Sequence, residues 1–143
     1  MIFSAALPAV NAATVLACLD IMEQEPERVK RLHDVARRMR AAYRDIGLLV
    51  RDSVAPIIPI YVGSEEKAYL LSRDMFERGI FALPAVFPAV PRGKAIIRTG
   101  CMTSHENRHI EKVAEVLGSL SRKHRIRIED FDAGEPFLAK ASP

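Results

Sequence analysis

The chain has 143 residues, of which 49% are hydrophobic and 27% charged, and its formal net charge is +3. This length and balance are typical of one globular domain with its own core. No stretch of about 18 consecutive apolar residues occurs, which argues against a membrane protein. The two cysteines, Cys18 and Cys101, lie in apolar surroundings and indicate no disulfide framework, which favours a reducing, cytoplasmic location.

Two helices are predicted at the start of the chain. Pro8 suits the first turn of a helix, and residues Ala9 to Gln24 are apolar nearly all round, so we expect a long helix that is buried on most sides. Pro26 opens a second helix, whose Arg and Lys residues form a solvated face. Gly47 supplies its stop. The apolar stripe of this helix comprises Val29, Leu32, Val35, Met39, Tyr43 and Ile46.

A strand and a third helix follow. The β-branched segment Pro56 to Val62 predicts a strand. Pro59 predicts that this strand is irregular or lies at a sheet edge, because proline donates no hydrogen bond. Ser64 is expected to cap a helix from Glu65 to Arg78. The inward-facing residues of that helix are predicted to be Ala68, Leu71, Met75 and Phe76.

Two more strands, at Ile80 to Leu83 and Lys94 to Thr99, are expected on either side of a loop. The loop, Pro84 to Gly93, contains three prolines and should have a fixed shape. A capping box at Thr103 to Glu106 opens the last helix. Its core side carries Ile110, Val113, Leu117 and Leu120.

This order predicts an α+β fold: a small, largely antiparallel sheet of about three strands with helices packed on one face, preceded by a long buried helix. Residues 1–124 are expected to form one small domain, in which residues 1–25 are an interdomain or interface helix. Residues 125–143 mix acids, Gly and Pro without a period and predict a flexible or loosely packed tail.

Few residue patterns point to chemistry. Cys101, His105 and His109 have i, i+4, i+8 spacing, but Cys101 precedes the helix and no fourth ligand is evident, so no metal site is assigned. No nucleophile stands near a base and no glycine-rich phosphate loop occurs, so no catalytic residue is assigned. The basic segment Arg122 to Arg127 lacks interleaved aromatic residues, which favours a solvated helix end over phosphate or nucleic-acid contact.

Arg98 is the polar residue of most interest. It lies inside a β-branched strand directly after the rigid loop, where solubility does not require a charge. A guanidinium held there can bind a carboxylate through two parallel hydrogen bonds. On this evidence a structural salt bridge and a site for a substrate anion both stay open.

Six segments form an ordered set: Ile2 to Pro8, Ala55 to Pro59, Glu77 to Ile80, Phe87 to Gly93, Lys94 to Arg98 and Ser104 to Glu106. They resemble, in order and spacing, segments near the C-terminus of the α-oxoamine synthases, enzymes of the aminotransferase-like fold type I that depend on pyridoxal 5'-phosphate (PLP). The resemblance covers about Ile2 to Lys123.

The resemblance implies a function. Members of the family condense an amino acid with an acyl thioester, usually an acyl-CoA, and PLP serves as the electron sink. By this resemblance Arg98 binds the carboxylate of the amino-acid substrate, and Ala89 lies near the substrate where several members have threonine. Ser4 would bind the PLP phosphate of the neighbouring subunit in a homodimer, with Ala5 beside it.

The sequence also departs from a complete enzyme of that family. It has no lysine in a PLP-binding context, no aromatic or histidine residue to stack on the cofactor ring and no aspartate for its nitrogen. We expect these groups in a large domain upstream and expect the chain alone to be inactive. The alternative is a non-catalytic α+β binding or dimerisation module derived from the same fold.

Overall fold

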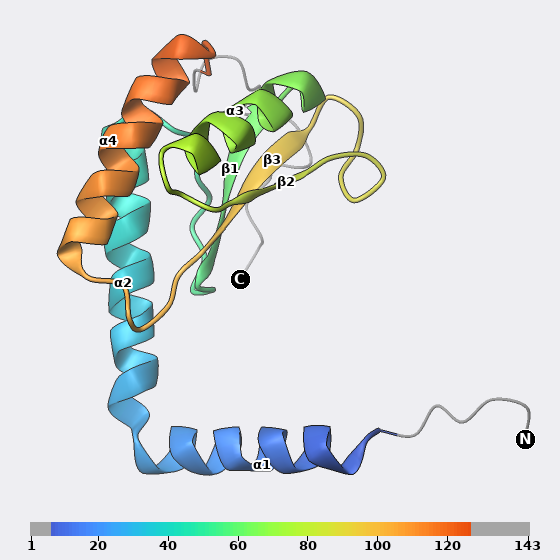
Figure 1. The fold of residues 1–143 in the computed structure, drawn as a ribbon. Helices are drawn as coiled ribbons and strands as arrows, with labels where there is room; N and C mark the ends of the chain where they lie inside the picture. The colour runs from blue at the N-terminus through green and yellow to red at the C-terminus, as the bar shows by residue number, and fades with distance from the viewer. Residues whose placement is uncertain (1–6, 127–143) are drawn as a thin grey trace, which may run out of the picture.

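The computed structural model describes residues 7–126 (Figure 1). A three-stranded sheet has the order β1-β3-β2, and both strand pairs are antiparallel. Its strands are β1 (Ile57–Gly63), β2 (Leu83–Ala85) and β3 (Ala95–Gly100). The α+β class and the small antiparallel sheet are therefore as predicted. Pro59 lies in the edge strand β1, as its missing donor required.

Three helices pack on one face of this sheet: α2 (Pro26–Asp45), α3 (Glu65–Glu77) and α4 (Asn107–Lys123). Alternate strand residues point to opposite faces, and those under the helices form the core. Ile58 and Ile60 of β1 and Ile97 of β3 are fully buried there, with Leu71 of α3 and Leu117 of α4. The other face of the sheet carries no helix among residues 7–126.

The second strand begins later than predicted, at Leu83 instead of Ile80. Gly79 closes α3 with a φ of 79°, and the N–H of Ile80 donates to the carbonyl of Met75 at 2.9 Å. Ile80 is thus held by the end of the helix and cannot join the sheet. The strand instead takes Pro84 and Ala85 from the expected loop.

Two details of the helices differ from prediction. Phe76 is 65% exposed, because the buried stripe of α3 ends at Met75 and the next residue is rotated by about 100°. The last helix begins at Asn107 and is capped by Glu106, not by the segment around Ser104. The Glu106 side chain accepts from the backbone of His109, and the N–H of Glu106 donates to Nδ1 of His109 at 2.9 Å.

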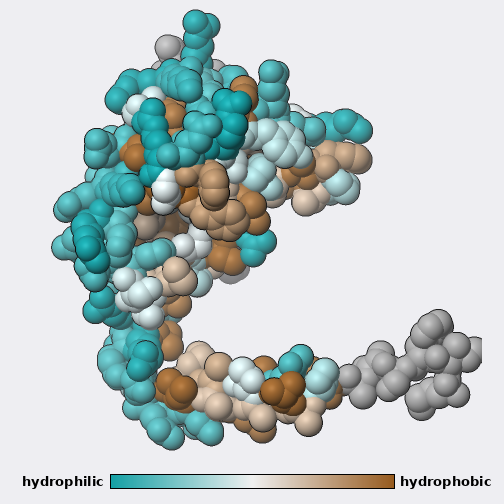
Figure 2. Space-filling view, in the orientation of Figure 1, coloured by the Kyte–Doolittle hydropathy of each residue, from teal (hydrophilic) through white to brown (hydrophobic). Residues whose placement is uncertain are grey.

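The helix α1 (Ala9–Gln24) has the predicted bounds, but the prediction that it is buried is wrong. None of its residues is buried, because it leaves the end of α2 and extends away from the sheet (Figure 1). Figure 2 shows hydrophobic residues along α1, whereas the outer side of α2 is mostly hydrophilic. Within the described chain, α1 therefore presents its apolar surface to solvent.

The remaining expectations concern the ends of the chain. Most of the predicted tail lies outside the described residues. Ile126, near its start, is buried in the core. None of the helices within residues 7–126 combines the length and the hydropathy needed to cross a bilayer.

Candidate functional site

Arg98 lies in the middle of the central strand β3. In the register of the sheet it is paired with Pro59 of β1 on one side and with Leu83 of β2 on the other. Its neighbours Ile97 and Thr99 are buried under the helices, so the side chain of Arg98 is directed to the opposite face, where it is exposed. The sheet thus presents one guanidinium on its helix-free face.

The surroundings of Arg98 on that face are apolar. Leu83 and Ile57 are 57% and 42% exposed, and Ile96 is half-buried. Within residues 7–126, the side chain of Arg98 forms no hydrogen bond or ion pair. The structural salt bridge that the sequence left open is therefore absent from the described chain. The donors of the guanidinium are free to bind an external anion.

The strand that carries Arg98 is held firmly. The Thr99 hydroxyl donates to the carbonyl of Ile58 at 2.7 Å, inside the core. Tyr43 of α2 is packed against this region, and burial raises the pKa of its hydroxyl to about 12, with the hydrogen bond to Thr99 acting in the opposite direction. These contacts fix β3 against β1 and α2, so the position of Arg98 is set by the core beneath it.

Ala89, the second predicted substrate residue, lies in the loop between β2 and β3. It is exposed, and its N–H donates to the carbonyl of Val86 at 2.8 Å. In the same loop, the guanidinium carbon of Arg92 lies 4.3 Å from the centroid of the Phe87 ring, a cation–π contact. The loop and Arg98 belong to one β2–loop–β3 unit, with Arg98 two residues beyond the Ala85–Ile96 pair.

The chain was compared with known proteins. The sequence profile of the family described as aminotransferase class I and II matches residues 1–117. The chain belongs to this family. A serine palmitoyltransferase from Bacteriovorax stolpii is 32% identical to it over 120 residues, which are 84% of this chain and 29% of the relative. An 8-amino-7-oxononanoate synthase from Symbiobacterium thermophilum is 37% identical over 122 residues, 85% of this chain and 31% of the relative.

Solved structures agree on the fold of this aminotransferase-family chain. A serine palmitoyltransferase from S. paucimobilis matches 87% of the chain with a TM-score of 0.78 at 21% identity, and the match covers 32% of that protein. An 8-amino-7-oxononanoate synthase from Francisella tularensis matches 85% with a TM-score of 0.70, covering 35% of that protein. The resemblance to α-oxoamine synthases is confirmed, and the chain spans about a third of the length of these relatives.

The residues present do not by themselves fit a PLP site. Ser4 and Ala5, the predicted cofactor-binding residues, lie outside the described residues. Among the lysines of residues 7–126, Lys67 Nζ donates to the carbonyl of Arg125 and Lys123 Nζ to Asp74. No lysine lines the surface groove on α2, the groove formed by α3 and β2 or the groove between α2 and the start of α4. The described part of this family member therefore offers an exposed arginine on the helix-free sheet face, and none of these grooves contains a lysine that could hold the cofactor.

The Cys101–His105–His109 spacing brings two histidines together. Their ring centroids lie 5.9 Å apart, and each Nδ1 accepts a backbone N–H, from Met102 and Glu106 respectively. Burial and the neighbouring His109 lower the pKa of His105. No group of three His, Cys, Asp or Glu side chains that could hold a metal ion is found in residues 7–126.

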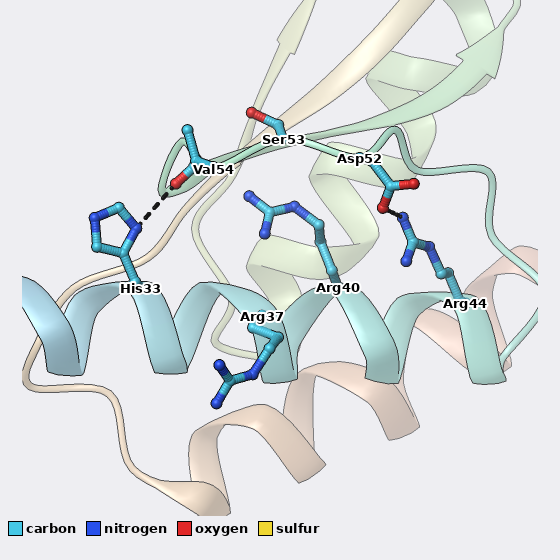
Figure 3. A pocket seen from close by; sticks show the side chains of 7 residues that line it. All are labelled: His33, Arg37, Arg40, Arg44, Asp52, Ser53 and Val54. Carbon is cyan, nitrogen blue, oxygen red and sulfur yellow. Dashed lines mark hydrogen bonds and ion pairs between the residues drawn. The ribbon is translucent and has the colours of Figure 1, made fainter. Parts of the chain in front are cut away.

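A basic groove on α2 is not evident from the sequence. Arg37, Arg40 and Arg44 follow steps of three and four residues, a spacing that predicts a solvated face. For Arg40 that interpretation is wrong, because the residue is only 7% exposed. The loop from Asp52 to Val54 covers it, as Figure 3 shows. The helical spacing of the three arginines can be read from the sequence, but the loop that covers Arg40 cannot.

Proposed function

We propose that this chain is the substrate-binding C-terminal part of a PLP-dependent acyltransferase of the α-oxoamine synthase type, which condenses an amino acid with an acyl-CoA. The relatives named above are acyl-transferring synthases, and a solved relative of the same fold was determined with a PLP adduct bound. The single observation that carries the proposal is Arg98, an exposed guanidinium on an apolar sheet face that has no ion-pair partner within residues 7–126.

The chemistry of Arg98 suits the carboxylate of an amino acid. The planar guanidinium offers two parallel N–H donors that match the two oxygens of a carboxylate. Leu83 and Ile96 border it and would exclude water once the face is covered, which strengthens the charge-assisted hydrogen bonds. Arg98 then fixes one end of the substrate and orients the amino group and α-carbon toward the reacting centre.

In this proposal residues 1–124 form the small domain, and residues 1–25 form an interface helix. The lysine and the groups that contact the cofactor ring belong to a large upstream domain. Ser4 and Ala5 lie near the cofactor phosphate of the neighbouring subunit in a homodimer, and Ala89 borders the substrate. When bound, PLP supplies the electron sink that stabilises a carbanion.

The test uses the intact enzyme that contains this chain. We expect Arg98→Ala to weaken amino-acid binding about ten- to a hundredfold, because a charge-assisted hydrogen bond contributes roughly 1.5–3 kcal/mol. Arg98→Lys should recover part of the loss, since an ammonium group cannot reproduce the planar fork. Binding is followed by the absorbance change of PLP, and the melting temperature is recorded beside it.

Arg108→Ala is the matched control. It also removes one positive charge, but from an exposed position on α4 and not from the helix-free face of the sheet that carries Arg98. It should leave the affinity for the amino acid unchanged. If Arg98→Ala keeps its affinity but lowers the melting temperature strongly, Arg98 is a structural residue and the assignment fails.

The 143-residue chain on its own is expected not to bind PLP stoichiometrically, because no lysine lines the groove on α2, the groove at α3 and β2 or the groove between α2 and α4. Titration with PLP, followed by absorbance, measures this directly. A saturable one-to-one signal that a single lysine substitution abolishes would show that the chain contains a cofactor site of its own.

A further inference from the structure

Arg40 is a buried cation in a surface groove. It projects from α2 beneath the loop from Asp52 to Val54, and the groove between helix and loop has a volume of about 440 Å³ (Figure 3). Arg40 is 7% exposed, whereas Arg44 of the same groove has a side chain that is 45% exposed. The groove lies on α2 and is separate from Arg98, which is exposed on the helix-free face of the sheet.

The charge of Arg40 has no acidic partner in residues 7–126. Its Nη2 donates to the carbonyl of Ala55, a neutral acceptor. The other arginines are paired differently: Arg44 Nη2 lies 2.5 Å from Oδ1 of Asp52, and Arg37 forms an ion pair with Asp34. In Figure 3 the side chain of Arg37 is directed away from that of Arg40.

Burial of an uncompensated guanidinium is unfavourable, and proteins balance such charges with an acid or a bound anion. The lining of the groove contains three arginines against one acid, Asp52, and that acid is engaged by Arg44. The groove therefore has an excess of positive charge at its buried end.

Neutral donors complete the groove. Ser53 Oγ accepts the N–H of Ala55 at 3.0 Å, which leaves the hydroxyl hydrogen available to an acceptor. Nδ1 of His33 lies 3.1 Å from the carbonyl of Val54, an acceptor, so this nitrogen donates and holds the loop against α2. The walls are thus fixed by contacts that do not use the free donors of Arg40.

We propose that this groove binds a small oxyanion of the phosphate class, with Arg40 at its base and Arg44 and Ser53 at its rim. A phosphate group presents three oxygens and up to two negative charges, which matches more than one guanidinium and a hydroxyl. A single carboxylate would satisfy Arg40 alone and leave the donors of Arg44 and Ser53 at the rim unused.

Titration of the 143-residue chain with pyrophosphate and with inorganic phosphate at low salt tests this proposal, by calorimetry or by NMR shifts. We expect saturable one-to-one binding that Arg40→Gln weakens at least about tenfold. Asp52→Asn should tighten binding several-fold, because the anion no longer competes with Asp52 for Arg44. If Asp52 only supported the fold, Asp52→Asn would not increase the affinity for the anion.

Arg122→Gln, on the exposed end of α4, is the control for net charge and should change the affinity by less than about twofold. If Arg40→Gln does not fold, Arg44→Gln, at the exposed rim, should still weaken binding several-fold at an unchanged melting temperature. Absence of saturable binding, equal loss in the Arg44 and Arg122 variants, or no gain in Asp52→Asn overturns the proposal. Equally strong binding of glutamate also overturns it and points to an acidic protein segment.

Discussion

Oδ2 of Asp74 accepts a hydrogen bond from Nζ of Lys123 at 2.6 Å, which joins α3 to the last turn of α4. The same oxygen lies 2.9 Å from Nε2 of His124, and Oδ1 accepts from Arg73 at 3.0 Å. Asp74 is only 3% exposed, and its partners, Lys123 first, hold the pKa of its carboxyl far below the usual range even though burial acts in the opposite direction.

We expect Asp74→Asn to lower the free energy of unfolding by about 2–3 kcal/mol, because a buried, charge-assisted network loses its central acceptor. Urea unfolding followed by circular dichroism measures this. Glu77→Gln is the matched control on the same helix. Its carboxylate is 67% exposed and lies 3.9 Å from Arg73, so its removal should change the stability by less than about 0.5 kcal/mol. Equal effects of the two substitutions would contradict a special role for Asp74.

The same carboxyl predicts a pH dependence. Its pKa in the folded chain lies below the value of about 3.9 that an unfolded aspartate has. Such a group stabilises the fold fully above the unfolded pKa and loses that contribution as the pH falls through the folded pKa. The stability difference between wild type and Asp74→Asn should therefore be present at pH 5 and shrink as the pH falls below about 4. A difference that grows as the pH falls below about 4 would contradict the assignment.

Much of the fold follows from local sequence signals. The helix bounds of α1 and α2, the cap at Ser64 and the edge position of Pro59 were all predicted from periodicity, proline and capping residues. These features depend on neighbours within a few residues, which a single sequence displays. Arg98 was identified in the same way, from its place in a β-branched strand directly after a proline-rich loop.

The features that sequence analysis missed depend on distant contacts. Asp74 meets Lys123 across 49 residues, and Arg40 is covered by a loop that begins 12 residues later. Neither partner follows from helical spacing, so the sequence indicates a solvated face at Arg40 and no particular role for Asp74. The exposure of α1 was missed for the opposite reason: its composition is that of a buried helix, and composition does not reveal whether a partner is present.

Neighbouring residues of β3 should differ sharply in their contribution to stability. Arg98→Ala is expected to change the free energy of unfolding of this chain by less than about 0.5 kcal/mol, because the exposed side chain of Arg98 forms no hydrogen bond or ion pair within residues 7–126. Thr99→Val should cost about 1–2 kcal/mol, since the buried carbonyl of Ile58 loses its donor. Thermal and urea unfolding of both variants measure this. A destabilised Arg98→Ala variant would indicate a structural role and weaken the proposed function.

The exposed surface of α1 predicts self-association of the chain. Leu16 and Leu19, one turn apart, are 62% and 49% exposed, and burial of one such side chain contributes about 1.5–3 kcal/mol. We expect association at tens of micromolar in sedimentation velocity, weakened at least about tenfold by the double substitution Leu16→Gln and Leu19→Gln. The double substitution should not change the melting temperature of the chain, because α1 contributes no buried residue. Phe81→Gln, at a 75% exposed position on the body, is the control for lost apolar surface and should leave association intact. A monomeric wild type, or equal weakening by Phe81→Gln, would show that α1 is not the contact surface.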